Sequence, residues 1–288
     1  MARTVRVRSR AVEPRESRVL VSVTPRQAGW RYVKFAVRQI AAKDSWRAAT
    51  SNEELCLVLL EGRCLVSWDG VEAEIGPRRD VFSGYPHAVY LPKKTPFTVD
   101  AVERTVIADC RAPAGGGGAH PPRVIVPEDC GFEVRGGGNA TRQIVDILPP
   151  AFPAGRLLIC EVFTPSGNWS SYPPHKHDKH NPPREVDLEE VYYYRFKHPD
   201  AYGIQRLYGP GDRGDQAVTV RNGDLVLVRD GYHPFVAAHG YDAYYLNVLA
   251  GSARSMAASD DPRYAGFRAR WPAPDPRVPV VAPPVRGS

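Results

Sequence analysis

The residues best suited to chemistry lie between Ser171 and Phe196, where two histidines precede an acidic pair. His175 and His177 are two positions apart. Residues with this spacing in a β-strand point to the same face, with Cα atoms roughly 6.6 Å apart, so their imidazoles can bind one metal ion. Glu189 or Glu190, at the start of the strand-forming run that follows, could supply a third ligand. The stretch therefore predicts a metal site inside a β-barrel.

The two halves of the chain resemble each other around this stretch. The pair Glu53–Glu54 precedes an apolar run, as Glu189–Glu190 does. Downstream, Thr95–Phe97 resembles His233–Phe235 at nearly the same offset. Chance similarity between β-rich segments is the alternative, but two copies of one β-unit are the simpler account.

The histidines cluster in the second copy. His175 and His177 precede its acidic pair, whereas residues 44–51 of the first copy contain no histidine. His233 stands where the first copy has Thr95. Accidental histidines would be spread more evenly, so the clustering favours one metal site in the second copy.

The carboxylate of this site is expected to be Glu190. In each copy the second glutamate directly precedes the apolar run, and neighbouring strand residues face opposite ways, so only one glutamate of the pair can point inward. The predicted ligands are His175, His177, Glu190 and His233. Three neutral nitrogens and one carboxylate suit Zn²⁺, which is favoured here, or Mn²⁺ or Fe²⁺.

The composition favours short strands over long helices. The 288 residues include 28 prolines and 25 glycines, and several segments alternate apolar with polar residues. A run of four glycines at 115–118 is the best boundary. An all-β chain is expected, with an N-terminal half without metal ligands (1–114), a Gly/Pro linker (115–122), a metal-binding half (123–271) and a Pro-rich tail (272–288), extended or disordered.

Charge and hydropathy argue against several classes of partner. The net charge is +6, but no dense basic block follows the first ten residues, so no nucleic-acid partner is expected. No apolar run reaches the roughly 18 residues of a membrane helix, and the N-terminal residues lack a secretion signal. Five cysteines without a CxxC pair suggest reduced thiols, mostly in the core: Cys56, Cys64, Cys110 and Cys160. A cytoplasmic protein is expected.

Several motifs resemble the 5-deoxy-glucuronate isomerase family of myo-inositol catabolism. They are PHKHD, EEVYYYRF, GIQRLYG, NGDLVLVRDGYHP, GYDAYYLNVLAG and the segment RGGGNATRQIVDIL, and the resemblance covers most of residues 30–271. It implies a bicupin fold of two tandem jelly-roll barrels. It also implies an aldose–ketose isomerase that converts 5-deoxy-D-glucuronate, a small anionic sugar acid, to 5-dehydro-2-deoxy-D-gluconate. The related 4-deoxy-5-ketouronate isomerases have metal ligands that match the four residues predicted above. We also expect a homo-oligomer, with the first half as a scaffold.

The chain departs from ordinary cupins in the spacing before the carboxylate. Glu190 lies thirteen residues after His177, where ordinary cupins leave only a few. Glu189 and Asp178 are therefore alternatives for this ligand. His239 is an alternative for the last histidine, because it also precedes the strand-forming run that starts near residue 243.

The implied reaction needs a stabilised oxyanion and a proton carried between two neighbouring carbons. A divalent ion supplies the first, and a carboxylate, a metal-bound water or a tyrosine could supply the second. Tyr192 and Tyr194 share the face of Glu190 and are candidates, with core packing as the alternative. Gln205 or Arg206 could bind a hydroxyl or the carboxylate of the substrate. The catalytic base is not identified.

Two other functions are compatible with the same ligands. A metal-dependent cupin dioxygenase would need a redox-active ion and an apolar pocket, against which the tyrosine-rich, arginine-containing strands argue. A sugar-binding cupin without catalysis is the second alternative, and such proteins often lose the ligand set that this chain keeps.

Overall fold

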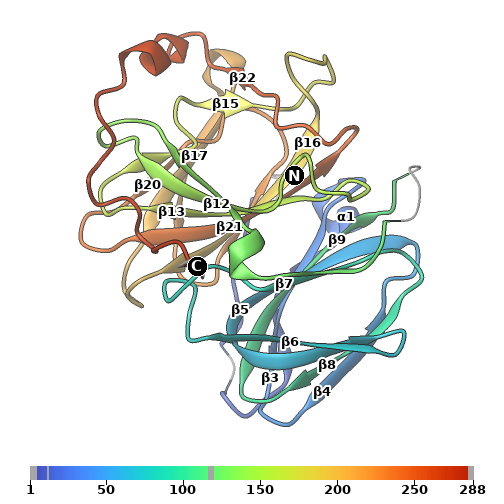
Figure 1. The fold of residues 1–288 in the computed structure, drawn as a ribbon. Coiled ribbons are helices and arrows are strands. Elements are labelled where there is room, and N and C mark those ends of the chain that lie inside the picture. The colour runs from blue at the N-terminus through green and yellow to red at the C-terminus, as the bar shows by residue number, and fades with distance from the viewer. Residues whose placement is uncertain (1–4, 12, 116–119, 285–288) are drawn as a thin grey trace.

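The chain folds into two β-barrels that pack side by side. The computed structural model describes residues 5–11, 13–115 and 120–284. Residues 116–119 of the expected linker and 285–288 of the expected tail lie outside the described residues. The first half, blue to teal in Figure 1, lies below the second half, which runs from green to red. Helices are few and short, and the expected all-β class is confirmed.

The first barrel is built on a nine-stranded sheet. Its elements before the glycine run are β2 (Arg18–Val23), α1 (Pro25–Ala28), β3 (Lys34–Ile40), β4 (Ser45–Ala49), β5 (Glu53–Trp68), β6 (Val71–Arg78), β7 (Ala88–Leu91), β8 (Pro96–Ala101) and β9 (Thr105–Pro113). The long strand β5 pairs with β9 and β7 through its first part and with β6 and β8 through its second part. It therefore belongs to both faces of the barrel and closes one corner.

The second barrel has a seven-stranded sheet that faces the first barrel and a four-stranded sheet behind it. Its elements are η1 (Pro127–Asp129), β11 (Gly131–Arg135), β12 (Arg142–Leu148), β13 (Leu158–Thr164), β14 (Trp169–Ser170), β15 (His175–Lys176), β16 (Leu188–Phe196), β17 (Gly203–Gly209), η2 (Pro210–Asp212), β18 (Arg213–Val220), β19 (Leu225–Val228), β20 (Phe235–Ala237), β21 (Ala243–Gly251), β22 (Ser259–Asp260) and η3 (Ala265–Arg270). Strand β16 lies inside the larger sheet, between β19 and β21.

Two short strands pair with the half to which the sequence does not assign them. Strand β1 (Arg6–Val7), within residues 1–114, pairs with β19 of the second barrel. Strand β10 (Arg123–Ile125), which follows the glycine run, pairs with β7 of the first barrel. Each half therefore places a terminal strand on the sheet edge of the other half.

The strand register shows which residues of the two halves correspond. Glu54 on β5 and Glu189 on β16 hold the same place relative to β9 and β21, each opposite an alanine. Each carboxylate accepts hydrogen bonds from three successive backbone N–H groups of the other half. Glu54 binds residues 155–157, and Glu189 binds residues 31–33. Glu54 therefore corresponds to Glu189.

This register corrects the correspondence expected from the sequence, which matched Glu54 with Glu190. The counterpart of Glu190 is Leu55, one residue further along β5. Leu55 is fully buried in the apolar interior of the first barrel. Glu190 points into its own barrel, as strand alternation requires, although it does not correspond to Glu54.

Buried apolar side chains form four clusters, the smallest around Leu158 and Leu249. The largest cluster lies between the two barrels and draws residues from both, among them Phe35, Cys56, Phe163 and Tyr193. Smaller clusters fill the interior of each barrel. The four cysteines expected in the core are buried, as predicted. No helix among the described residues is long and apolar enough to span a membrane.

One ion pair is buried in the contact between the barrels. Arg78 of the first half donates to both carboxylate oxygens of Glu161 in the second half, at 2.7 and 2.8 Å. The Tyr244 hydroxyl donates to the same carboxylate at 2.9 Å. The two Nη atoms of Arg78 also donate to backbone carbonyls of the first half, whereas the buried Nε has no hydrogen-bond partner. Because both charges are paired and hydrogen-bonded, their burial is tolerated.

The described part of the Pro-rich tail packs against the second half, with bends and a turn along its course. The Gly138 backbone N–H donates to the Ala273 carbonyl at 2.9 Å. Further along, the Gln143 side chain bonds both the N–H and the carbonyl of Val281, which is buried. These contacts fix the described part of the tail on the second barrel.

Candidate metal centre

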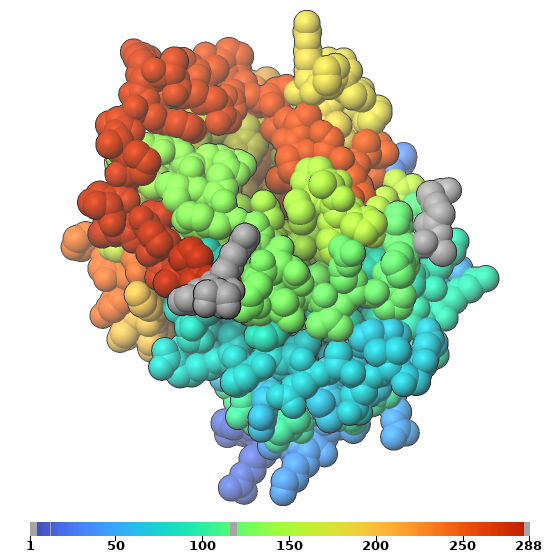
Figure 2. Space-filling view, in the orientation of Figure 1, coloured from blue at the N-terminus to red at the C-terminus, as the bar shows by residue number. Residues whose placement is uncertain are grey.

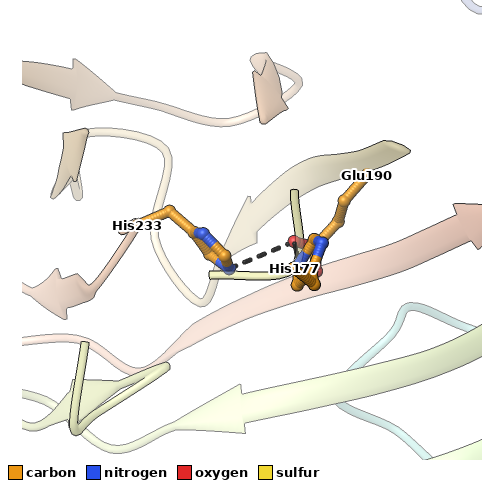
Figure 3. A group of neighbouring side chains, drawn as sticks. All are labelled: His177, Glu190 and His233. Atoms are coloured by element: carbon orange, nitrogen blue, oxygen red, sulfur yellow. Dashed lines mark hydrogen bonds and ion pairs between the residues drawn. The ribbon is translucent and has the colours of Figure 1, made fainter. Parts of the chain in front are cut away.

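Three of the four predicted ligands meet inside the second barrel (Figure 3). His177 follows β15, Glu190 lies on β16, and His233 lies in the loop between β19 and β20. Their ligand atoms are all within 4.8 Å of one another, and all three residues are buried. Glu190 Oε2 lies 3.0 Å from His177 Nε2 and 3.2 Å from His233 Nε2. We call this set the ligand triad.

Backbone carbonyls fix the orientation of each imidazole. Nδ1 contacts a carbonyl oxygen at 3.0 to 3.1 Å in every case: Leu188 for His177, Gly231 for His233, and Pro173 for His175. A carbonyl can only accept, so Nδ1 carries the hydrogen, and Nε2 of a neutral ring keeps its lone pair. Metal-binding histidines are commonly held in this way.

Hydrogen-bond acceptor atoms of the triad face one another. In neutral rings, both Nε2 atoms present lone pairs to the Glu190 carboxylate, which also only accepts. Burial lowers the pKa of His233 to about 3, and its Nε2 has no hydrogen-bond partner. Burial also lowers the pKa of His177, but the hydrogen bond with Glu190, the charge of Glu190 and the backbone hydrogen bond at Leu188 together outweigh it, and the pKa is raised. Without a metal, a proton on His177 can neutralise the carboxylate, whereas the donor set as a whole fits a divalent cation.

His175 borders the triad without belonging to it. Its ring centroid lies 4.9 Å from that of His233 and 6.4 Å from that of His177. The structure places it on the cavity that opens beside the triad. Burial, followed by the neighbouring charge of His177, lowers the pKa of His175 to about 3, so this ring is also neutral near pH 7.

The three alternative ligands are either bonded to other groups or exposed to solvent. Glu189 accepts backbone hydrogen bonds from residues 31–33. Asp178 accepts from Lys176 at 2.7 Å and from the Gly231 N–H at 2.9 Å. His239 is exposed. The geometry therefore favours Glu190 and His233 over them.

Two amide side chains position residues of the triad through hydrogen bonds. Asn247 donates to Glu190 Oε1 at 2.6 Å and fixes the carboxylate. The buried amide of Gln205 donates to the His233 carbonyl and accepts from the Tyr194 hydroxyl. Gln205 was expected to bind substrate, but strand alternation turns it into the core behind His233. Tyr194 is likewise a core residue and does not line the cavity.

Arg206 also lies away from the cavity beside the triad. It follows Gln205 on β17 and therefore points outward, where it pairs with Asp215 at 2.7 and 2.9 Å. It lines a different hollow, of about 430 Å³, with aromatic walls that include Trp169 and Phe267. This placement does not favour contact between Arg206 and a substrate beside the triad.

A cavity of about 400 Å³ opens beside the triad. Figure 2 shows the surface hollowed between the green segment and the orange and red segments of the second half. Tyr192 lines this cavity, as predicted, and its hydroxyl lies 2.8 Å from Ser171 Oγ. The polar lining that the sequence did not single out comprises the acids Glu133 and Asp146 together with Arg135, Arg142, Arg268, Ser171, Tyr245 and Asn247.

Two of these missed residues lie in motifs that the sequence did show. Arg142 is in RGGGNATRQIVDIL, and Tyr245 is in the strand-forming run AYYLNV. Arg142 and Ile144 point into the same barrel, since residues two apart in a strand share a face. That alternation could have identified Arg142, but the glycines before it conceal where the strand begins.

Comparison with known proteins agrees with this architecture. The KduI/IolB family model matches residues 6–267. The 5-deoxy-glucuronate isomerase of Geobacillus kaustophilus is 44% identical over 255 residues, covering 86% of this chain and 90% of that protein. The enzyme of the same name from Halalkalibacterium halodurans is 38% identical over 267 residues, covering 92% and 98%.

Solved structures agree as well. The crystal structure of an IolB-like protein from Salmonella typhimurium LT2 superposes with a TM-score of 0.87 at 37% identity, covering 92% of this chain and 99% of that one. An oxalate decarboxylase superposes with a TM-score of 0.65 at 10% identity, covering 90% and 80%. The second likeness concerns the fold alone and confirms the expected bicupin architecture. On the extent of the family match and the identity to these relatives, the chain belongs to the KduI/IolB family.

Proposed function

We propose that this protein is a 5-deoxy-glucuronate isomerase. It would convert 5-deoxy-D-glucuronate to 5-dehydro-2-deoxy-D-gluconate, an aldose–ketose isomerisation in myo-inositol catabolism. The observation that carries the proposal is a cavity lined by arginines beside a buried His–Glu–His triad, in a chain whose relatives carry that name. Its volume of about 400 Å³ can accommodate a six-carbon sugar acid.

The proposed metal ligands are His175, His177, Glu190 and His233. Their support is the clustering of the last three, the carbonyl-oriented imidazoles and the acceptors that need a cation between them. Zn²⁺ is the favoured ion, with Mn²⁺ and Fe²⁺ as alternatives. When bound, the ion polarises the carbonyl and the neighbouring hydroxyl of the substrate.

The cavity residues would hold the substrate and its protons. Burial raises the pKa of Tyr192 and raises that of Tyr245 to about 12, so both phenols stay protonated near pH 7. Tyr192 lies near Ser171 and Tyr245 near Ser170, so their hydroxyls are orientated. They are suited to donate hydrogen bonds to substrate oxygens rather than to act as the base.

The test is incubation of zinc-loaded protein with 5-deoxy-D-glucuronate in the absence of oxygen, followed by NMR. We expect the aldehyde or hydrate carbon signal to be replaced by that of a ketone at the neighbouring carbon. Conversion that requires oxygen and redox-active iron would instead support the dioxygenase. Binding of the sugar acid without turnover would support a sugar-binding protein and contradict the isomerase.

Further proposals concern the organisation of the chain. We infer that residues 1–114 form a scaffold half and residues 123–271 the catalytic half, joined by residues 115–122 and followed by the tail from 272. The support is that Leu55 stands in the first barrel where Glu190 stands in the second. Five cysteines without a disulfide fit a reducing compartment, so a cytoplasmic location is proposed. The homo-oligomer stays a prediction, which light scattering can test.

A further inference from the structure

Arg142 differs from the other arginines that line the cavity beside the triad. Arg135 is paired with Glu133, at 2.6 and 2.8 Å, and Arg268 is paired with Asp260. Arg142 has no carboxylate partner anywhere in the described part of the chain. The residue is nevertheless only 3% exposed to solvent. It is thus a buried cation whose counter-ion the protein does not supply.

The bonds that Arg142 does make leave much of its guanidinium free. Nη1 donates to the Tyr172 carbonyl at 2.9 Å and to the Ala140 carbonyl at 3.3 Å. Among the described residues, no acceptor binds its Nε or Nη2. Burial lowers the pKa of Arg142 to about 10, so the group is still a cation near pH 7. A buried charge without a partner is costly, and proteins rarely keep one without a ligand to pair with it.

Arg142 shares a cavity with residues of the metal centre. It lines the same cavity as His175, His177 and Glu190. A ligand in this cavity can therefore place one end at the triad and an anionic end at Arg142.

We propose that Arg142 binds the carboxylate of the substrate and thereby selects sugar acids over neutral sugars. This inference rests on the proposed function and adds to it the residue that recognises the acid group. Nη1 is anchored to the loop at Tyr172, which leaves Nε and Nη2 for a carboxylate. Two parallel N–H···O bonds from one guanidinium match the two carboxylate oxygens.

Arg135 and Arg268 are less suited to this role. Each guanidinium is already neutralised by a carboxylate, so a second anion would have to compete with it. Both are also about 40% exposed or more, whereas Arg142 is shielded from water. A shielded ion pair is weakened less by solvent than an exposed one.

The test compares Arg142→Met and Arg142→Gln with the wild type. Substrates are 5-deoxy-D-glucuronate and the neutral analogue in which CH₂OH replaces the carboxylate. We expect kcat/KM for the acid to fall about 100-fold or more, because a site built to bond a charged group discriminates strongly. Turnover of the neutral analogue should change little, so the acid-to-neutral ratio collapses. Bound zinc should stay at the wild-type level. Arg142→Gln keeps an N–H donor for the loop carbonyls and serves if Arg142→Met does not fold.

Arg254→Met is the matched control. Arg254 also binds only backbone carbonyls, those of residues 149, 150, 152 and 157, but it lies outside the cavity. Its replacement should leave the acid-to-neutral ratio at the wild-type value, because Arg254 does not face the substrate. A ratio that stays at the wild-type value in Arg142→Met or Arg142→Gln, with normal zinc content, overturns the inference and leaves the isomerase proposal standing.

Calorimetric binding of D-glucuronate and 5-deoxy-D-glucuronate separates the two proposals further. If the wild type binds either acid through Arg142 but converts neither, the inference holds and the isomerase proposal fails. If the wild type binds and converts neither acid, both fail. Binding that is equally strong in wild type and both Arg142 variants overturns the inference by itself.

Discussion

At the scale of single residues, the site depends on which atoms of each side chain are already bonded. Backbone carbonyls occupy Nδ1 of His175, His177 and His233, so the Nε2 atoms are left for a ligand. Asn247 occupies one oxygen of Glu190 and leaves the other facing the imidazoles. The sequence can identify such residue types, but not their bonding, because the carbonyls involved come from residues with no distinctive side chain.

Because these imidazoles are neutral, we predict that acid lowers the stability of the metal-free protein. Burial lowers the pKa of His175 and His233 from 6.5 to about 3. Groups with a lowered pKa in the folded state stabilise it fully above the unfolded value and lose this contribution as pH falls toward the folded value. The free energy of unfolding should therefore decrease between about pH 6.5 and 3. His177, with a raised pKa, opposes part of this loss.

Urea unfolding of chelated protein between pH 7 and 4 measures this effect. Other carboxylates also titrate in that range, so the control is the double variant His175→Gln and His233→Gln. We expect its stability to depend less steeply on pH than that of the wild type. Equal slopes for the two proteins would show that these imidazoles are not held neutral.

At the scale of elements, strand parity decides which side chains reach the site. The alternation of β16 could be predicted, and it places Glu190 and Tyr192 inward. The correspondence predicted between the two copies is offset by one residue from the observed one. Each copy has two adjacent glutamates, and only their contacts with the other half distinguish them. On β17, Gln205 points into the core and Arg206 points outward. The sequence of this strand alone does not show which of its two faces is buried.

The element scale also predicts a structural role for Glu54. Its carboxylate accepts from the N–H groups of residues 155–157, at 2.5 to 2.7 Å, and from the Tyr90 hydroxyl at 2.7 Å. Glu54→Ala should lower the free energy of unfolding by about 3 kcal/mol or more, because buried donors lose a charged acceptor. Urea midpoints measure the change.

Glu53→Ala is the control for this experiment, because Glu53 adjoins Glu54 but forms a partly exposed pair with Lys34 at 2.9 Å and a longer pair with Arg111 at 3.5 Å, and Arg111 keeps Asp109 as a partner. Its loss should cost about 1 kcal/mol or less. If Glu54→Ala is no more destabilising than Glu53→Ala, the carboxylate does not hold the two halves together as the structure indicates.

At the scale of the whole molecule, two copies of one barrel have different tasks. The repeat, the all-β class and the placement of the histidines in the second copy could be predicted from the sequence. The exchange of β1 and β10 between sheet edges could not, because short strands carry little periodicity. The Arg78–Glu161 pair was also missed, since its partners are 83 positions apart and neither lies in a recognisable motif.

The difference between the copies carries the central claim, which is that one metal ion in the second barrel is needed for isomerisation. Leu55 and Thr95 stand in the first barrel where the second has Glu190 and His233, so only the second barrel should bind the ion. The most direct measurement is a titration of chelated protein with Zn²⁺, in which bound zinc and conversion of 5-deoxy-D-glucuronate are followed together. We predict that activity rises in proportion to bound zinc and reaches its plateau at one ion per chain. Full activity in the zinc-free protein, or a plateau at two ions per chain, would contradict the account.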